Sequence, residues 1–121
     1  MSDNPNDVAI EAWNTVLFDK FVQFRRVLTD GLTEHGEVAL KEHPYPKGAR
    51  VLDIGCGFGD ATQAIAQMVG PTGAAVGIDC AENFVALANN EARQRGVANA
   101  SYFVADVQSQ DLHGPYDHAF A

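Results

Sequence analysis

The chain has 121 residues, of which 46% are hydrophobic and 20% are charged. This composition suits one folded globular domain and argues against a disordered chain. The formal net charge is −8, with 8 Lys and Arg residues against 16 Asp and Glu residues. A phosphate backbone is repelled by such a surplus, so nucleic acid is not an expected partner, and an uncharged or cationic small ligand is compatible with it.

The two cysteines, Cys56 and Cys80, form no CxxC motif and no disulfide framework. This predicts reduced thiols in a cytoplasmic protein. Each cysteine follows the end of an expected strand, so we expect both near the same ligand. No stretch approaches the ~18 apolar residues of a membrane span, and residues 1–5 lack the basic and apolar segments of a signal peptide.

Apolar residues recur at steps of three and four over residues 8–28, which predicts an amphipathic helix. Two interpretations of its aromatic residues stay open. The helix packs on a core, or Trp13, Phe21 and Phe24 form a wall or lid over a ligand pocket. A second, short helix is expected over residues 33–41.

Two prolines and a glycine predict a loop over residues 42–48. We therefore expect N-terminal helices and a linker over residues 1–47, followed by a unit over residues 48–121. In that unit, strands alternate with helices. The expected strands cover residues 51–54, 74–79, 100–105 and 116–121, and the expected helices cover 61–69 and 82–95. This alternation predicts βαβ units and a parallel sheet in an α/β, Rossmann-like fold.

A glycine-rich turn directly follows the first expected strand. Gly55, Gly57 and Gly59 let the backbone turn tightly and let a ligand approach it closely. The third glycine comes one place earlier than in the dinucleotide fingerprint, and no Lys-Ser or Lys-Thr of a P-loop follows. Asp53 and Asp60 flank the turn. They would repel a pyrophosphate by ~1 kcal/mol per close pair, but they would attract a sulfonium or ammonium group.

Acidic residues also follow the next two expected strands, at Asp79 and Asp106. Ligands of open α/β sheets bind beyond the carboxyl ends of the strands, where these acids would meet the glycine turn. Asp79 lies 24 residues after Gly55, near the spacing of an acid that binds ribose hydroxyls. This favours a nucleoside ligand. Taken alone, Asp79 is also explained as a helix cap and Asp106 as a solvated loop acid.

Residues 51–59, with the pattern D-x-G-x-G-x-G, resemble motif I of class I S-adenosylmethionine-dependent methyltransferases. Residues 76–79 resemble motif II, residues 103–107 resemble motif III, and residues 116–117 are similar to the start of the fourth strand. The likeness is strongest to the small-molecule branch, the type 11 and ubiquinone/menaquinone-biosynthesis methyltransferases. A Trp-Asn pair in the N-terminal helix, such as residues 13–14, is common there.

The resemblance implies S-adenosylmethionine as cofactor and assigns roles by position. The backbone around Gly55 and Gly57 would hold the methionine portion, with Asp53 near its ammonium group. Asp79 would bind both ribose hydroxyls. Residues near Ala119 would touch the methionine end.

The resemblance also implies an adenine site. Cys80 and Ala81 would flank the ring, Asp106 would accept from its amino group, and the backbone N–H of Val107 would meet a ring nitrogen. The expected cofactor-binding residues are Asp53, Gly55, Cys56, Gly57, Gly59, Asp79, Cys80, Ala81, Asp106 and Val107.

The reaction that the resemblance implies is methyl transfer from the sulfonium to an O, N, C or S atom of a small-molecule acceptor. Such a transfer needs mainly positioning and exclusion of water, and whether a general base is needed depends on the acceptor. We name no catalytic residue and no metal site. The histidines have no partner visible in the sequence and are expected at the surface: His35, His43, His113 and His118.

Compared with the family, the chain is short, and it ends at or just after the expected fourth strand. We therefore expect a truncated chain with a partial sheet in the strand order 3-2-1-4. Its apolar edge at residues 116–121 would be exposed, which predicts self-association. Two alternatives stay open. One is a cofactor-binding or self-associating module without turnover. The other, weaker one is an NAD-dependent oxidoreductase, which the glycine spacing and the two flanking acids disfavour.

Overall fold

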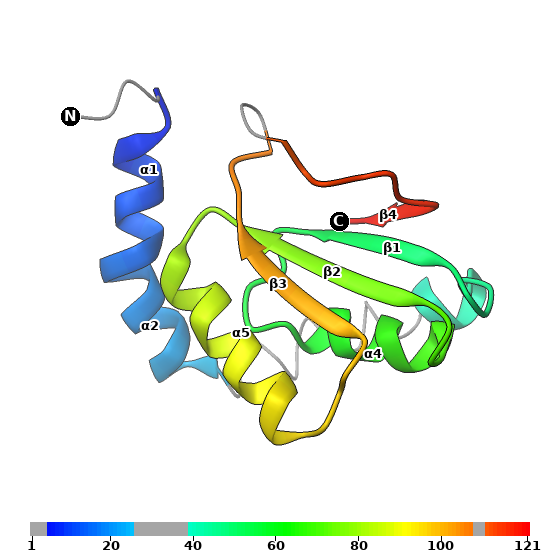
Figure 1. Ribbon diagram of the computed structural model, residues 1–121. Helices are drawn as coiled ribbons and strands as arrows, with labels where there is room; N and C mark the ends of the chain where they lie inside the picture. The colour runs from blue at the N-terminus through cyan, green and yellow to red at the C-terminus, as the bar shows by residue number, and fades with distance from the viewer. Residues whose placement is uncertain (1–4, 26–38, 108–110) are drawn as a thin grey trace.

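The computed structural model describes residues 5–25, 39–107 and 111–121. At its centre lies a four-stranded parallel sheet in the order β3-β2-β1-β4 (Figure 1). The strands are β1 (Arg50–Ile54), β2 (Ala74–Asp79), β3 (Ala100–Val104) and β4 (His118–Phe120). The Rossmann-like α/β class and the strand order 3-2-1-4 are thereby confirmed.

Two crossover helices cover one face of the sheet (Figure 1). Helix α4 (Asp60–Val69) joins β1 to β2, and α5 (Glu82–Gln94) joins β2 to β3. Side chains alternate between the two faces of a strand, so every second residue of β1 and β2 meets these helices. The main buried cluster on this face consists of Leu40, Ala49, Val51, Ile65, Ala66, Val69 and Ala75.

The opposite face of the sheet is covered by the segment that leads into β4. Leu52, Val76 and Ile78 point to this face, and Leu112 and Tyr116 pack against them. The segment is fixed at β1, because the guanidinium of Arg50 lies 4.6 Å from the ring centroid of Tyr116 and its side chain donates to two backbone carbonyls of the segment. The parallel pairing of β4 with β1 completes this edge of the sheet.

The N-terminal helical segment packs beside the start of α5 (Figure 1). It consists of α1 (Asp7–Ala12), a π-helical turn η1 (Trp13–Leu17) and α2 (Phe18–Gln23). The expected helix is confirmed over its described part, with a π-helical turn that an α-helical period does not reveal. Residues 26–28 lie outside the described residues, as does most of the expected helix over 33–41, but residues 39–42 are helical.

The boundary at residue 47 stays a prediction. Among the residues that the structure describes, no helix has the length and apolarity needed to cross a membrane.

Candidate functional site

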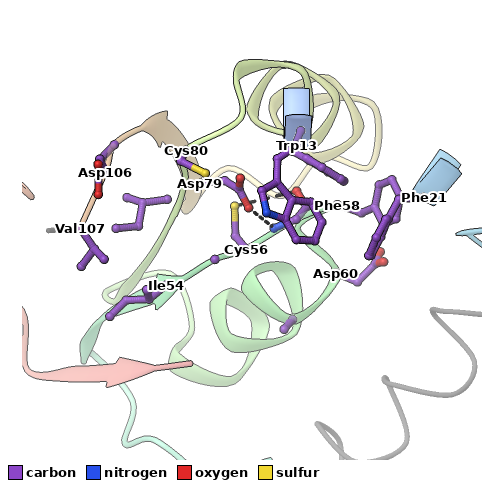
Figure 2. Close-up of a pocket in the computed structure, with 16 residues that line it drawn as sticks. Trp13, Phe21, Ile54, Cys56, Phe58, Asp60, Asp79, Cys80, Asp106 and Val107 are labelled. Carbon is purple, nitrogen blue, oxygen red and sulfur yellow. Dashed lines mark hydrogen bonds between the residues drawn. The ribbon is translucent and has the colours of Figure 1, made fainter. Parts of the chain in front are cut away.

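A cavity of about 500 Å³ opens beyond the carboxyl ends of β1, β2 and β3 (Figure 2). Ligand pockets typically measure ~300–1,000 Å³, so the cavity has the size of a small-molecule site. The sequence-predicted residues that line it are Gly55, Cys56, Gly57, Asp79, Cys80, Asp106 and Val107. Three other predicted residues do not line it, namely Asp53, Gly59 and Ala81.

The glycine turn presents bare backbone to this cavity. Gly55 and Gly57 have φ angles of +69° and +53°, and a Cβ atom at either position would meet nothing within 4 Å. Gly59, with φ of +84°, serves packing instead, because a Cβ there would lie 2.7 Å from the hydroxyl oxygen of Tyr102. That hydroxyl donates to the Gly59 carbonyl at 3.0 Å. Tyr102 therefore fixes the end of the turn at Gly59, whereas the backbone at Gly55 and Gly57 is left accessible to a ligand.

Asp79 joins the two loops that carry the site. One carboxylate oxygen accepts from the backbone N–H of Gly57 at 3.1 Å (Figure 2). The other accepts from the backbone N–H of Ala81 at 3.0 Å. A carboxylate offers about four acceptor positions, so each oxygen keeps capacity for a hydroxyl in the cavity. Asp79 thus fixes the glycine turn and lines the cavity at the same time.

Asp53 lies behind the glycine turn. Its side chain is only 3% exposed and accepts from the hydroxyl of Thr62 on α4 at 2.5 Å. Burial raises the pKa of Asp53 to about 6, the hydrogen bond from Thr62 opposes this rise, and the charge of Asp79 adds to it. The contact with a ligand ammonium group stays a prediction, and in this structure the carboxylate joins β1 to α4, the helix that follows the turn.

Asp60 lines the cavity, but its charge is balanced. Its carboxylate lies 3.6 Å from Arg25 and 3.6 Å from Arg95. Arg25 also makes a two-bond ion pair with Glu91, one bond measuring 2.7 Å, and lies 4.4 Å from the ring centroid of Phe58. The hydrogen bond from Arg25 is the main cause that lowers the pKa of Glu91. We expected Asp60 to attract a cationic ligand, but in this structure its carboxylate lies close to two arginines of the chain itself.

An aromatic wall faces the glycine turn. Trp13 and Phe21 line the cavity with ring centroids 5.2 Å apart, and Phe21 lies 6.0 Å from Phe84. Figure 2 shows Trp13 and Phe21 on one side of the cavity and Asp106 and Val107 on the other. The interpretation as a pocket wall is confirmed for Trp13 and Phe21. It is wrong for Phe24, which is 51% exposed and does not line the cavity.

Polar contacts hold the N-terminal segment along the cavity, and sequence reasoning missed them. The side-chain amide of Asn6 donates to Asp106 at 2.8 Å, Asn14 bonds to Asn83 near the end of β2, and Arg25 pairs with Asp60 and Glu91. The segment therefore passes the loops after β3, β2 and β1 in turn. Contacts between residues this far apart in the chain leave no local pattern in the sequence, and the Trp-Asn pair at residues 13–14, which the family resemblance supplies, is the one signal of these contacts.

Both thiols line the cavity, as expected, and both cysteines are free. Burial raises the pKa of Cys56 and of Cys80, so the thiols are neutral parts of the wall. His43, His113 and His118 are exposed, and His35 lies outside the described residues. In the described ranges, no group of three or more His, Cys, Asp or Glu residues is placed to hold a metal ion.

A family model described as a methyltransferase domain matches residues 46–121. Aklanonic acid methyltransferase of Streptomyces sp. (strain C5) is 44% identical over 62 residues, which cover 51% of this chain and 28% of that protein. A 23S rRNA (uracil(1939)-C(5))-methyltransferase of Acinetobacter baumannii (strain AB0057) is 36% identical over 72 residues, 60% of this chain and 14% of that one. The demethylmenaquinone methyltransferase of Geobacillus sp. (strain WCH70) is 33% identical over 78 residues, 64% of this chain and 31% of that one.

Among solved structures, a SAM-dependent methyltransferase from Aquifex aeolicus is similar, with a TM-score of 0.58 and 30% identity. The likeness covers 64% of this chain and 41% of that one. The chain thus spans less than half the length of each of these proteins. Their names cover both small-molecule and ribosomal RNA acceptors.

Proposed function

Because the chain belongs to the S-adenosylmethionine-dependent class I methyltransferases, we propose that its cavity binds S-adenosylmethionine for methyl transfer to a small-molecule acceptor. S-adenosylmethionine is the cofactor of this family, and the residues present fit it. The observation that carries the proposal is the position of the Asp79 carboxylate. It accepts hydrogen bonds from the backbone N–H groups of Gly57 and Ala81, and it lines the cavity beside the open glycine turn.

The charges around the cavity favour a cationic nucleoside over a dinucleotide. Asp79 and Asp106 line the cavity, and no Lys or Arg does so among the described residues. A pyrophosphate would therefore meet carboxylates at the wall of the cavity, which repel it, whereas a sulfonium or ammonium group is attracted. This supports S-adenosylmethionine and weakens the alternative of an NAD-dependent oxidoreductase.

In this proposal, each side of the cavity holds one part of the cofactor. The bare backbone at Gly55 and Gly57 holds the methionine portion, and Asp79 binds the ribose hydroxyls. The adenine lies beside Cys80, with Asp106 accepting from its amino group.

Other predicted residues act from behind the wall. Asp53 joins β1 to α4 through Thr62, Gly59 anchors the turn on Tyr102, and the backbone N–H of Ala81 holds Asp79. The backbone N–H of Val107, which lines the cavity beyond β3, completes the adenine site of the proposal.

Bound S-adenosylmethionine supplies an electrophilic methyl group on a sulfonium, which an acceptor nucleophile attacks in line. The chain contributes orientation and exclusion of water, which are the main needs of such a transfer. The rings of Trp13, Phe21, Phe58 and Phe84 make the wall near the glycine turn apolar. We assign no general base, because none of the described histidines lines the cavity.

A small-molecule acceptor is favoured over RNA by the net charge of −8, which would repel a phosphate backbone. The two free cysteines favour a reducing, cytoplasmic location. The proposal includes self-association through β4, which lies at the edge of the sheet with His118 and Ala119 exposed. Light scattering at high concentration tests this part, and a clean monomer mass would contradict it.

Calorimetric titration of the chain with S-adenosylmethionine, S-adenosylhomocysteine and NAD tests the proposed function. We expect both methionine nucleosides to bind and NAD not to bind. Asp79→Ala removes an acceptor of charge-assisted hydrogen bonds, each worth ~1.5–3 kcal/mol, so we expect about a 100-fold loss of affinity. Asp111→Ala, at an exposed acid outside the cavity, is the matched control.

NAD binding without a response to either methionine nucleoside would overturn the proposal. Methyl transfer is then followed by mass spectrometry over a panel of small-molecule acceptors and ribosomal RNA. Transfer to RNA alone would contradict the proposed acceptor class. Cofactor binding without transfer to any acceptor would favour a binding module without turnover.

A further inference from the structure

Two hydrogen bonds join Asn14 and Asn83, which lie 69 residues apart. The side-chain oxygen of Asn14 accepts from the backbone N–H of Asn83 at 2.8 Å. In return, the side-chain amide of Asn83 donates to the backbone carbonyl of Asn14 at 2.6 Å. The pair fastens η1 of the N-terminal segment to the first turn of α5.

This contact completes the start of α5. The first N–H groups of a helix lack partners within the helix, and a polar N-cap side chain usually accepts from one of them. The N-cap of α5 is Ala81, whose side chain has no oxygen. The backbone N–H of Ala81 donates to the carboxylate of Asp79, and the backbone N–H of Asn83 donates to the side-chain oxygen of Asn14. Asn14 therefore caps α5 from a different segment of the chain.

The same contact sets the position of a cavity wall. Trp13 directly precedes Asn14, lines the cavity and is 38% exposed. None of the residues of α1, η1 or α2 is fully buried. Phe18 and Phe21 of α2 pack against the buried Phe84, whereas the bonds to Asn83 hold η1 itself. The capped first turn of α5 follows directly after Asp79 and Cys80, and these two residues line the cavity at the end of β2. Tying η1 there brings Trp13 to the cavity.

We propose that Asn14 is a positioning residue for the cofactor site. By capping α5, it holds the indole of Trp13 against the cavity, and it thereby raises the affinity for S-adenosylmethionine without lining the cavity itself. The inference rests on the proposed function. The effect of Asn14 on binding is indirect. When fewer molecules have Trp13 in place at the cavity, the apparent affinity for the cofactor decreases in proportion.

The test uses the fluorescence of the chain, whose single tryptophan is Trp13. For Asn14→Ala we expect red-shifted emission and a three- to tenfold weaker Kd for S-adenosylmethionine, as for the loss of about one hydrogen bond. Asn14→Asp keeps an oxygen acceptor at the positive end of α5 and restores both readouts. Thr15→Ala, which removes only a bond to Glu11 within the segment, is the matched control and stays at wild-type values.

Wild-type affinity and emission in a folded Asn14→Ala variant would overturn the inference, as would failure of Asn14→Asp to restore them. If the wild-type chain does not bind S-adenosylmethionine, the proposed function fails, whereas the emission of the ligand-free variants still tests the positioning. Should Asn14→Ala unfold, Asn83→Ala removes only the bond to the Asn14 carbonyl. A smaller red shift and a smaller loss of affinity are then expected, and no change in either would contradict the inference.

Discussion

The two walls of the cavity are held in different ways. The wall at the strand ends is built on hydrogen-bonded parallel strands with a buried core, and Asp79 ties its loops together through backbone N–H groups. The wall made by α1, η1 and α2 has no fully buried residue of its own. It is attached to distant parts of the chain by the rings of Phe18 and Phe21, which pack on Phe84, and by polar side chains such as those of Asn14 and Arg25. Elements with few buried contacts open at lower free energy. The structure therefore combines a firm wall with one that is easily loosened.

The largest effect is expected in the firm wall, from Gly59→Ala. A Cβ at this position clashes with Tyr102 and requires a left-handed backbone, which together cost ~3 kcal/mol of unfolding free energy. Gly57→Ala adds only the backbone strain of ~1–2 kcal/mol, since its Cβ would stand in open space. Urea unfolding of both variants measures the difference. Equal losses would show that Tyr102 does not pin the turn.

The next effect concerns Asp53 and pH. Its pKa is raised from 3.8 to about 6, so between these values the folded chain holds a proton that the unfolded chain has released. Its contribution to stability is therefore greatest at low pH, and it falls by up to ~3 kcal/mol as the pH rises through this window. Asp53→Asn should remove this decline. Urea unfolding at pH 4, 5, 6 and 7 checks it, and identical pH profiles for the two proteins would contradict the account.

A smaller effect is expected from Arg25→Ala in the helical wall. The variant loses the paired bonds to Glu91, which we expect to lower the free energy of unfolding by ~1 kcal/mol. Because the pKa of Glu91 is lowered in the folded chain, the difference should be largest at pH 7 and shrink as the pH falls through that pKa, which leaves the contact of Arg25 with Phe58. Lys20→Ala, at an exposed position of α2, is the control. A loss that persists unchanged at low pH would exclude the ion pair as its cause.

The smallest effect is expected from Phe24→Ala. Since Phe24 is exposed and does not line the cavity, we expect a change in unfolding free energy within ~0.5 kcal/mol and unchanged cofactor affinity. Phe21→Ala removes ring contacts to Trp13 and Phe84 and should cost at least ~1 kcal/mol. Thermal unfolding and calorimetry separate the two variants. Equal losses of unfolding free energy in the two variants would contradict the assignment of Phe21 to the cavity wall and of Phe24 to the exposed surface.

The firm wall could be predicted from the sequence because its signals are local. The glycine turn follows its strand directly, and Asp79 and Asp106 come at or just after the ends of the next strands. The position of Asp53 behind the cavity wall could also be predicted from the sequence. It lies two residues after Val51 and so on the same face of the sheet, where α4 packs, and this placement alone predicts a contact with that helix.

The attachment of the helical wall could not be predicted in the same way. A bond such as Asn14 to Asn83 depends on how two segments dock, and neither residue carries a local signature of it. The helical period correctly predicted that Trp13, at the start of η1, and Phe21, beyond η1, line the cavity, but it failed for Phe24. Phe24 is the C-cap of α2 and has left the helical conformation, so the helical face no longer describes its position.

The most direct test of the central claim, that both walls enclose one S-adenosylmethionine site, is a titration followed by NMR of the ¹⁵N-labelled chain. We expect the backbone N–H signals of Gly57 and Ala81 and the indole N–H signal of Trp13 to shift together, with one dissociation constant. NAD at the same concentrations should leave all three in place. Shifts at Gly57 and Ala81 with an unmoved Trp13 signal, or no shift at any of them, would contradict the account.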